Sequence, residues 1–280
     1  MTRPTAGIAT HILRSFDPAK HLRLLAAHDI HLIELSCGLY PYLADDGRFA
    51  GLRRALADSH IQVYSVHVPF SGAVPELGQM DISHPDGAVR EKVVAATMLC
   101  AERLAALGGR CLIIHPSCEP VEEADRPRRL DTAREGLLSL KSRVAPDGRV
   151  RIAIENLPRS NIGRDSAELV ALVEKLDSPL FGICLDVNHA NLREDLLEAT
   201  RNYAPHVLTT HVSDNDGAGE RHWLPGRGVI PFKEWIATLR ACGYAGPFLY
   251  ETGQAEGESD EQTVAAIAEN MRELFGAPER

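Results

Sequence analysis

The sequence lacks any long apolar run. Its most apolar stretch, 93–107, is interrupted by Glu102 and Arg103, whereas a membrane-spanning helix needs about 20 consecutive apolar residues. The segment from Met1 to Lys20 also lacks the apolar core of a secretory signal peptide. We therefore expect a cytoplasmic protein with no membrane-spanning helix.

Paired cysteines and glycine-rich nucleotide loops are also missing. The six cysteines form no CxxC pair and no zinc-finger spacing, so we expect reduced thiols rather than disulfides. Cys111 and Cys184 lie in apolar, strand-like runs, which predicts that they belong to the core. No GxGxxG follows the first candidate strand, and this absence disfavours a dinucleotide-binding fold.

Basic residues are fewer than acidic ones, 30 against 39, which gives a net charge of -9. This balance disfavours non-specific binding to nucleic acid or to anionic membranes. The one basic cluster, Arg126, Arg128 and Arg129, resembles the start of a solvated helix. With 44% hydrophobic residues, the composition excludes a mainly disordered chain.

What the chain does contain is a regular alternation of apolar runs and helical patterns. The strand candidates are 7–13, 32–35, 63–68, 111–115, 151–155, 181–186, 207–212 and 248–251. Helical spacing of apolar residues recurs over 18–28, 49–59, 89–107, 132–144, 166–176, 193–202, 232–242 and 262–274. Such alternation indicates parallel βαβ units. We predict one domain over residues 1–280, a closed (β/α)8 TIM barrel, with an open doubly wound sheet as the alternative.

Ionisable side chains collect at the ends of the predicted strands. Strands three to eight end at or beside His67, His115, Glu155, Asp186, His211 and Glu251. A barrel brings the carboxyl ends of its strands to one mouth, where active sites of this fold lie. Converging carboxylates and imidazoles suit a divalent cation such as Mn²⁺, Zn²⁺, Mg²⁺ or Co²⁺. Glu34, at the end of strand two, is either a substrate contact or a salt-bridged rim carboxylate.

Seven segments together resemble the xylose isomerase-like TIM barrel superfamily: SVHVPF, LIIHPS, IAIENLP, CLDVNHAN, THVSDNDG, PGRG and FLYET. This superfamily includes sugar and sugar-phosphate isomerases and epimerases, inosose dehydratases, hydroxypyruvate isomerases and endonuclease IV, and the resemblance covers nearly the whole chain. It implies a metal ion, Mn²⁺ or Zn²⁺ first, held by Glu155, Asp186, His211 and Glu251. It also implies that Glu155 and Glu251 transfer protons at a carbon next to a carbonyl. His189 matches a substrate-contacting histidine.

The segment 219–228 separates the subfamilies. Ketohexose 3-epimerases have an arginine where this chain has His222, and Glu220 with His222 resembles an acidic-x-His pair that holds a further zinc in endonuclease IV. His189 would join that pair, and His67 and His115 match further ligands of the same family. These five residues are therefore expected to bind substrate or additional metal.

The resemblance leaves several activities open. A metal-dependent isomerase or epimerase of a sugar, sugar phosphate or polyol is our first expectation. The alternatives are a multi-zinc phosphodiesterase acting on abasic DNA and an inosose dehydratase-like lyase. The acidic net charge and the lack of a basic, aromatic-interleaved surface argue against DNA. The expected partner is a small sugar or polyol, with no membrane or nucleic acid, and a homo-oligomer is possible.

Trp223 and Arg227, together with Glu34, are the three weaker candidates for substrate binding. Trp223 lies near the predicted mouth, where an indole could stack on a sugar, and Arg227 could reach an anionic substrate. The segment 71–86, which follows strand three, is either a lid or a solvated connector. Phe70 precedes it and could line the pocket.

Overall fold

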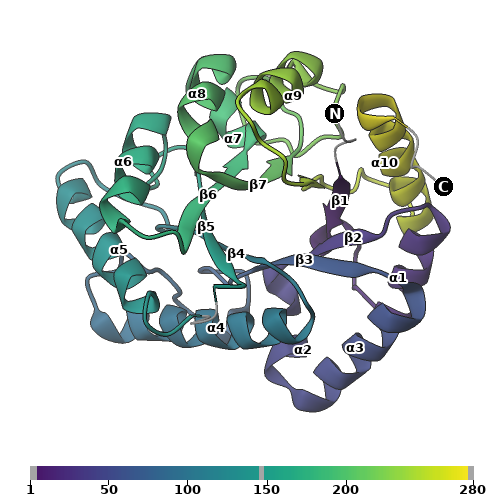
Figure 1. Ribbon diagram of the computed structural model, residues 1–280, viewed down its shortest axis with the longest axis horizontal. Helices are drawn as coiled ribbons and strands as arrows, with labels where there is room; N and C mark the ends of the chain where they lie inside the picture. The colour runs from purple at the N-terminus through teal and green to yellow at the C-terminus, as the bar shows by residue number, and fades with distance from the viewer. Residues whose placement is uncertain (1–4, 145–147, 277–280) are drawn as a thin grey trace.

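Eight parallel strands close into a barrel in chain order in the computed structural model, which describes residues 5–144 and 148–276 (Figure 1). The strands are β1 (Ala6–Ala9), β2 (Leu32–Leu35), β3 (Gln62–His67), β4 (Cys111–Ile114), β5 (Arg151–Glu155), β6 (Phe181–Asp186), β7 (Val207–Val212) and β8 (Phe248–Tyr250). β1 pairs with both β2 and β8, which closes the ring. The predicted (β/α)8 TIM barrel is confirmed.

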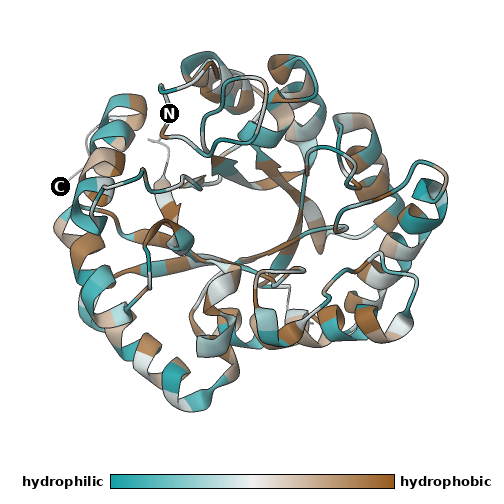
Figure 2. Ribbon diagram, turned by 180° about the vertical axis from the view of Figure 1, so that it is seen from behind, coloured by the Kyte–Doolittle hydropathy of each residue, from teal (hydrophilic) through white to brown (hydrophobic). Residues whose placement is uncertain are grey.

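The helices form an outer ring around the strands (Figure 1). They are α1 (Pro18–Ala27), α2 (Tyr40–Ala44), α3 (Asp46–Ser59), α4 (Gly87–Ala106), α5 (Arg126–Leu140), α6 (Ser166–Leu176), α7 (Val187–Asn191), α8 (Leu196–Tyr203), α9 (Phe232–Ala241) and α10 (Asp260–Phe275). Figure 2 shows that these helices carry both hydrophobic and hydrophilic residues, as expected of elements with one face on a barrel and one in water. No helix in the described ranges is long and apolar enough to cross a membrane.

Local signals explain several helix starts. Asp17 accepts a hydrogen bond from the backbone N–H of Lys20 and precedes Pro18, the first helical residue of α1. Ser259 and Gln262 form a reciprocal capping box at α10. These side chains satisfy backbone donors that the first turn of a helix leaves unpaired.

Inside the barrel, side chains alternate along each strand between the interior and the helices. Cys111, Ile113, Ala153 and Cys184 form a small buried cluster within the barrel, separate from the main core between strands and helices. All six cysteines are free, and Cys111 and Cys184 are buried as predicted. Glu155 lies two residues beyond Ala153 on β5, so the same alternation aims its side chain into the barrel mouth.

Two details differ from the sequence-based expectation. β1 ends at Ala9 rather than at residue 13, because Thr10–Ile12 form the 3₁₀ helix η1. Helix α5 starts at Arg126 rather than at residue 132. The prediction that the basic cluster is solvated is wrong for Arg126, because this side chain is buried and forms an ion pair with Glu168. Of the cluster, Arg128 is the member whose side chain is mainly exposed.

The segment 71–86 is partly buried rather than a freely solvated connector. Met80, Asp81, Ile82 and Ser83 are all buried. Arg129 forms an ion pair with Asp81 at 2.6 Å and donates to the Ser83 hydroxyl at 2.7 Å. This anchoring ties the segment to α5 beside the mouth of the barrel.

Candidate metal centre

Four ligand-type side chains converge at the carboxyl ends of β5 to β8. Glu155, Asp186, His211 and Glu251 each offer one atom, and these atoms lie within 4.8 Å of one another. His211 Nδ1 lies 3.2 Å from Glu155 Oε1 and 3.1 Å from Glu251 Oε2. Three of the residues end or lie in strands and Glu251 directly follows β8, so the closed barrel brings together residues far apart in the chain. We call these four residues the quartet.

Asp186 gives the test of whether the quartet fits a cation. Its Oδ1 accepts the backbone N–H of His189 at 2.9 Å, but its Oδ2 is buried with no hydrogen-bond partner. Burial raises the pKa of Asp186 to about 6, against the opposing charge of His189. A buried, unpartnered carboxylate oxygen beside two more carboxylates is costly unless a cation is bound. Three carboxylates and one imidazole are a donor set that divalent metals accept.

The pKa shifts within the quartet show strong coupling between its members. Burial opposes the ionisation of Glu155, but the charge of His211 and hydrogen bonds from His115, His211 and His67 hold the pKa of Glu155 well below its usual range. Burial likewise disfavours the protonated form of His211, but Cys184 and the carboxylates around the ring raise the pKa of its imidazole. The carboxylates and the His211 imidazole thus each favour the charged form of the other.

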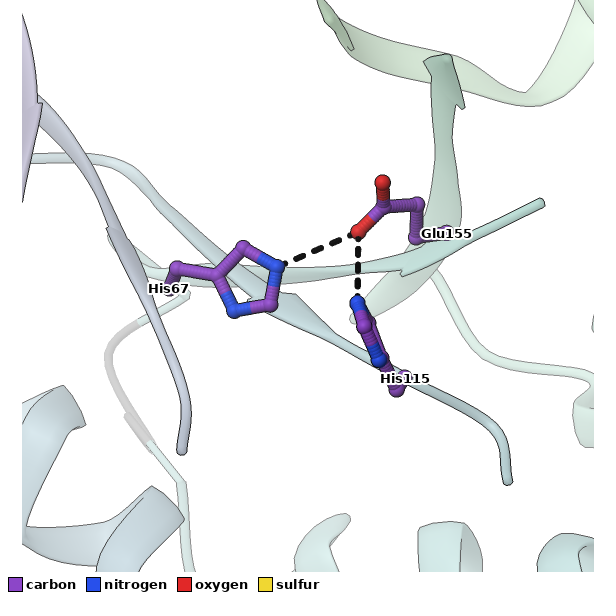
Figure 3. Close-up of side chains that lie close together, drawn as sticks. All are labelled: His67, His115 and Glu155. Atoms are coloured by element: carbon purple, nitrogen blue, oxygen red, sulfur yellow. Dashed lines mark hydrogen bonds and ion pairs between the residues drawn. The ribbon is translucent and has the colours of Figure 1, made fainter. Parts of the chain in front are cut away.

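A second group shares Glu155. Its Oε2 lies 3.1 Å from Nε2 of both His67 and His115, while its other oxygen points away from both rings (Figure 3). Nδ1 of His67 lies 2.9 Å from the carbonyl oxygen of Val68, which can only accept a hydrogen bond. Nδ1 must therefore carry a proton, and Nε2 is the atom that a neutral His67 presents to the group.

The third group is His189, Glu220 and His222. Nδ1 of His189 faces the carbonyl of Asn156 at 2.9 Å, and Nδ1 of His222 faces the carbonyl of Glu251 at 3.0 Å. Both rings therefore have Nε2 free to accept a proton or a metal, the arrangement usual for histidine ligands. Glu220 is engaged by an ion pair with Arg159.

A cavity of about 680 Å³ opens above these groups. Its lining includes the predicted residues His67, His115, Glu155, His189, Glu220, His222 and Glu251, together with Phe70. The Phe70 ring stacks on His115 with the ring centroids 4.2 Å apart. Asp186 and His211 lie deeper and are fully buried.

Sequence reasoning missed part of the lining of this cavity, which also includes His11, Ser36, Cys37 and Arg159. His11 was placed inside an extended first strand, whereas the chain leaves β1 at Ala9. The available signal in the sequence was that His11 is a polar residue just beyond the apolar run of the first strand.

The three weaker candidates lie elsewhere. Glu34 is fully buried beside His211 and does not line the cavity. Trp223 is exposed and pairs through its backbone with Asp214, and a guanidinium nitrogen of Arg227 lies 3.6 Å from a carboxylate oxygen of Glu258. Neither Trp223 nor Arg227 is among the lining residues of the cavity.

Known proteins resemble the chain over most of its length. An uncharacterized protein of Methanocaldococcus jannaschii, MJ1311, is 24% identical over 249 residues, covering 86% of this chain and 80% of the relative. A ketose 3-epimerase of Arthrobacter globiformis is 25% identical over 176 residues, covering 61% and 59%. The crystal structure of a D-tagatose 3-epimerase-like protein superposes with a TM-score of 0.81 at 22% identity, covering 97% of this chain and 98% of that one.

The family signature spans nearly the whole barrel. Residues 22–274 match the sequence profile described as xylose isomerase-like TIM barrel. The match runs from α1 to α10 and includes every member of the quartet. The chain belongs to the xylose isomerase-like TIM barrel family.

Proposed function

We propose that this protein is a divalent-metal-dependent isomerase or epimerase of a small keto sugar or polyol derivative. The observation that carries the proposal is the placement of two carboxylates, Glu155 and Glu251, against the same nitrogen of His211 at 3.2 and 3.1 Å. Both glutamates also line the cavity. The relative named ketose 3-epimerase supports the same class of substrate.

The quartet would hold the metal ion. When bound, a divalent cation supplies Lewis-acid stabilisation of the negative charge that develops on a sugar carbonyl oxygen. Glu155 and Glu251 are the bases available to a C–H bond next to that carbonyl. One group, as a carboxylate, takes the proton, and the other, in its protonated form, delivers a proton to the opposite face of the same carbon, which inverts it. If the proton is instead delivered to the neighbouring former carbonyl carbon, while the adjacent hydroxyl proton passes to the former carbonyl oxygen, the result is isomerisation.

The remaining ionisable lining residues favour a substrate without a phosphate group. Arg159 is the one arginine or lysine among the described residues that line the cavity. Its guanidinium is already engaged by Glu119, at 2.7 Å, and by Glu220. A phosphate ester would have to displace these carboxylates, whereas sugar hydroxyls can bond to the imidazoles of His189 and His222.

Substitution of Glu251 by glutamine tests the proposal. The purified protein is loaded with Mn²⁺ and given a panel of ketoses and their 6-phosphates, and deuterium uptake from D₂O is followed by NMR. Glu251→Gln keeps an oxygen ligand but loses the base, so turnover should fall by about 10²–10⁴-fold. Glu258→Gln, at a carboxylate outside the cavity lining, is the matched control and should retain wild-type turnover. Full activity of the Glu251 variant refutes its role.

A second candidate is a multi-metal phosphodiesterase. The three clusters and the bridging position of Glu155, with one oxygen toward each of two groups, favour it. The net charge of -9 and the ion pair that occupies Glu220 disfavour it. Metal analysis and cleavage of an abasic duplex separate the two: about one ion and no cleavage support the isomerase, whereas two to three zinc ions and cleavage support the hydrolase.

A lyase of the inosose dehydratase type would begin with the same proton abstraction. It differs in that a hydroxyl group on the adjacent carbon leaves as water. The NMR experiment distinguishes it, because dehydration yields a product that lacks one oxygen, whereas epimerisation conserves the composition of the sugar.

A further inference from the structure

We propose that Glu34 is a positioning residue that sets the tautomer of His211. In this role its carboxylate accepts the proton on Nε2 of His211 and thereby turns the Nδ1 lone pair toward the quartet. The inference rests on the metal-binding part of the proposed function and assigns Glu34 neither a substrate contact nor a place on the rim.

The two nitrogens of His211 face different partners. Nε2 lies 3.2 Å from Oε1 and 3.3 Å from Oε2 of Glu34, whereas Nδ1 lies 3.2 Å from Glu155 and 3.1 Å from Glu251. Both Glu34 and His211 are fully buried. Carboxylates only accept hydrogen bonds, and they face both nitrogens of His211. When the quartet holds a cation, Nδ1 gives its lone pair to that cation, so the ring proton lies on Nε2, where Glu34 accepts it.

The contact with His211 is the main interaction of the Glu34 carboxylate. Its Oε2 accepts the Ser65 hydroxyl at 2.7 Å and lies 3.3 Å from Nε2 of His211, whereas its Oε1 is buried with no hydrogen-bond partner. Its one ion-pair partner within the described ranges is His211. A buried carboxylate with so few partners is costly, and the adjacent imidazole of His211 is the group that offsets this cost.

The backbone places Glu34 by an irregularity in the sheet. Between β2 and β3, Ile33 pairs with Val63 but Glu34 pairs with Ser65, so the register shifts by one residue at this point. A bulge of this kind re-aims a side chain and is common beside active sites. The shift brings Glu34 level with the serine that donates to it.

The arrangement matches a general feature of metal sites. A ligating histidine usually donates its other ring N–H to a carboxylate or carbonyl, and loss of that partner typically weakens metal binding by about 10–100-fold. His67, His189 and His222 each use a backbone carbonyl for this purpose. His211 has a carboxylate instead, which adds negative charge behind the ring and makes Nδ1 a stronger ligand.

Calorimetric titration of Zn²⁺ into the chelator-treated protein tests the inference without any activity assay. Glu34→Leu removes the acceptor and should weaken Zn²⁺ binding by about 10–100-fold. Glu34→Gln keeps an amide oxygen that can accept from Nε2–H, so its loss should be smaller. Glu258→Gln is the matched control, because it removes a carboxylate that contacts Arg227 and Thr263 and has no contact with the quartet.

A second measurement needs no variant. In the Zn²⁺-loaded wild-type protein, ¹⁵N-histidine NMR should show the proton of His211 on Nε2. A proton on Nδ1, or a Glu34→Leu variant that folds and binds Zn²⁺ within twofold of wild type, overturns the inference. So does a wild-type chain that binds no cation, which also defeats the proposed function. Glu34-dependent Zn²⁺ binding without turnover of any ketose defeats only the proposed reaction.

Discussion

Replacement of Arg126 by methionine should destabilise the protein strongly. The Arg126 side chain donates to Glu168 at 2.7 and 2.9 Å, and to the carbonyls of Ser160 and Asn161 at 2.8 and 2.5 Å. Arg126 is 6% exposed. Methionine fills similar volume but leaves the carboxylate and both carbonyls without this donor.

The expected cost follows from the burial of the pair. Removing one partner of a buried ion pair costs about 3–5 kcal/mol, because the other charge remains uncompensated. At about 2 °C per kcal/mol for a chain of this size, the melting temperature should fall by about 6–10 °C. Urea unfolding at pH 7 measures the free-energy change directly.

Two further variants isolate the mechanism. Arg128→Met, two residues along the same helix, breaks a largely exposed pair with Asp125 and should cost no more than about 1 kcal/mol. The double variant Arg126→Met with Glu168→Met should be more stable than the sum of the single costs predicts, since it leaves no buried charge. If Arg126→Met costs less than about 1 kcal/mol, or the two single changes simply add, the reasoning is refuted.

Three other predictions concern the interior and the cysteines. Asp214 accepts the N–H groups of Gly226 and Gly228, both at 2.8 Å, so Asp214→Ala should lower the unfolding free energy by about 1–3 kcal/mol per orphaned donor in urea titrations; an unchanged midpoint contradicts this. Gly182→Ala would place a Cβ 2.5 Å from a Leu208 side-chain atom, and this overpacking should lower the unfolding free energy by about 1–3 kcal/mol in the same assay. An unchanged unfolding free energy contradicts this prediction. Burial raises the pKa of Cys111 to about 12, so at pH 8 a thiol-specific disulfide reagent should modify exposed Cys242 and leave Cys111 protonated and unreactive until the protein unfolds; rapid native labelling of Cys111 is the contrary outcome.

The strands could be predicted from the sequence because each is a short apolar run bounded by polar or turn-forming residues. Seven of the eight predicted strands agree with the observed bounds to within one residue at each end, including β8, which ends at Tyr250, one residue before the predicted end. The exception at β1 has a local reason, since Thr10 bonds to Ser36 of the next βα loop rather than continuing the ladder. Short helices such as α2 and α7 were missed, because five residues carry too little periodicity to be seen.

The proximity of the quartet was also foreseeable. Once eight βα units close, the residue at each strand end must lie at one mouth. Arg126 shows the opposite case: the local pattern of arginines indicates solvent, and only the approach of α6, which carries Glu168, makes burial of the guanidinium favourable.

Local information in the chain was thus sufficient for the order of the eight strands and the long helices between them, and for the residues that meet at the barrel mouth, because these follow from short-range periodicity plus closure of the ring. The tertiary packing alone decided which nitrogen of His211 faces Glu34 and which faces Glu155. It also decided that Arg159 neutralises Glu220, because side-chain direction and charge pairing depend on strand register and on loops from distant parts of the chain.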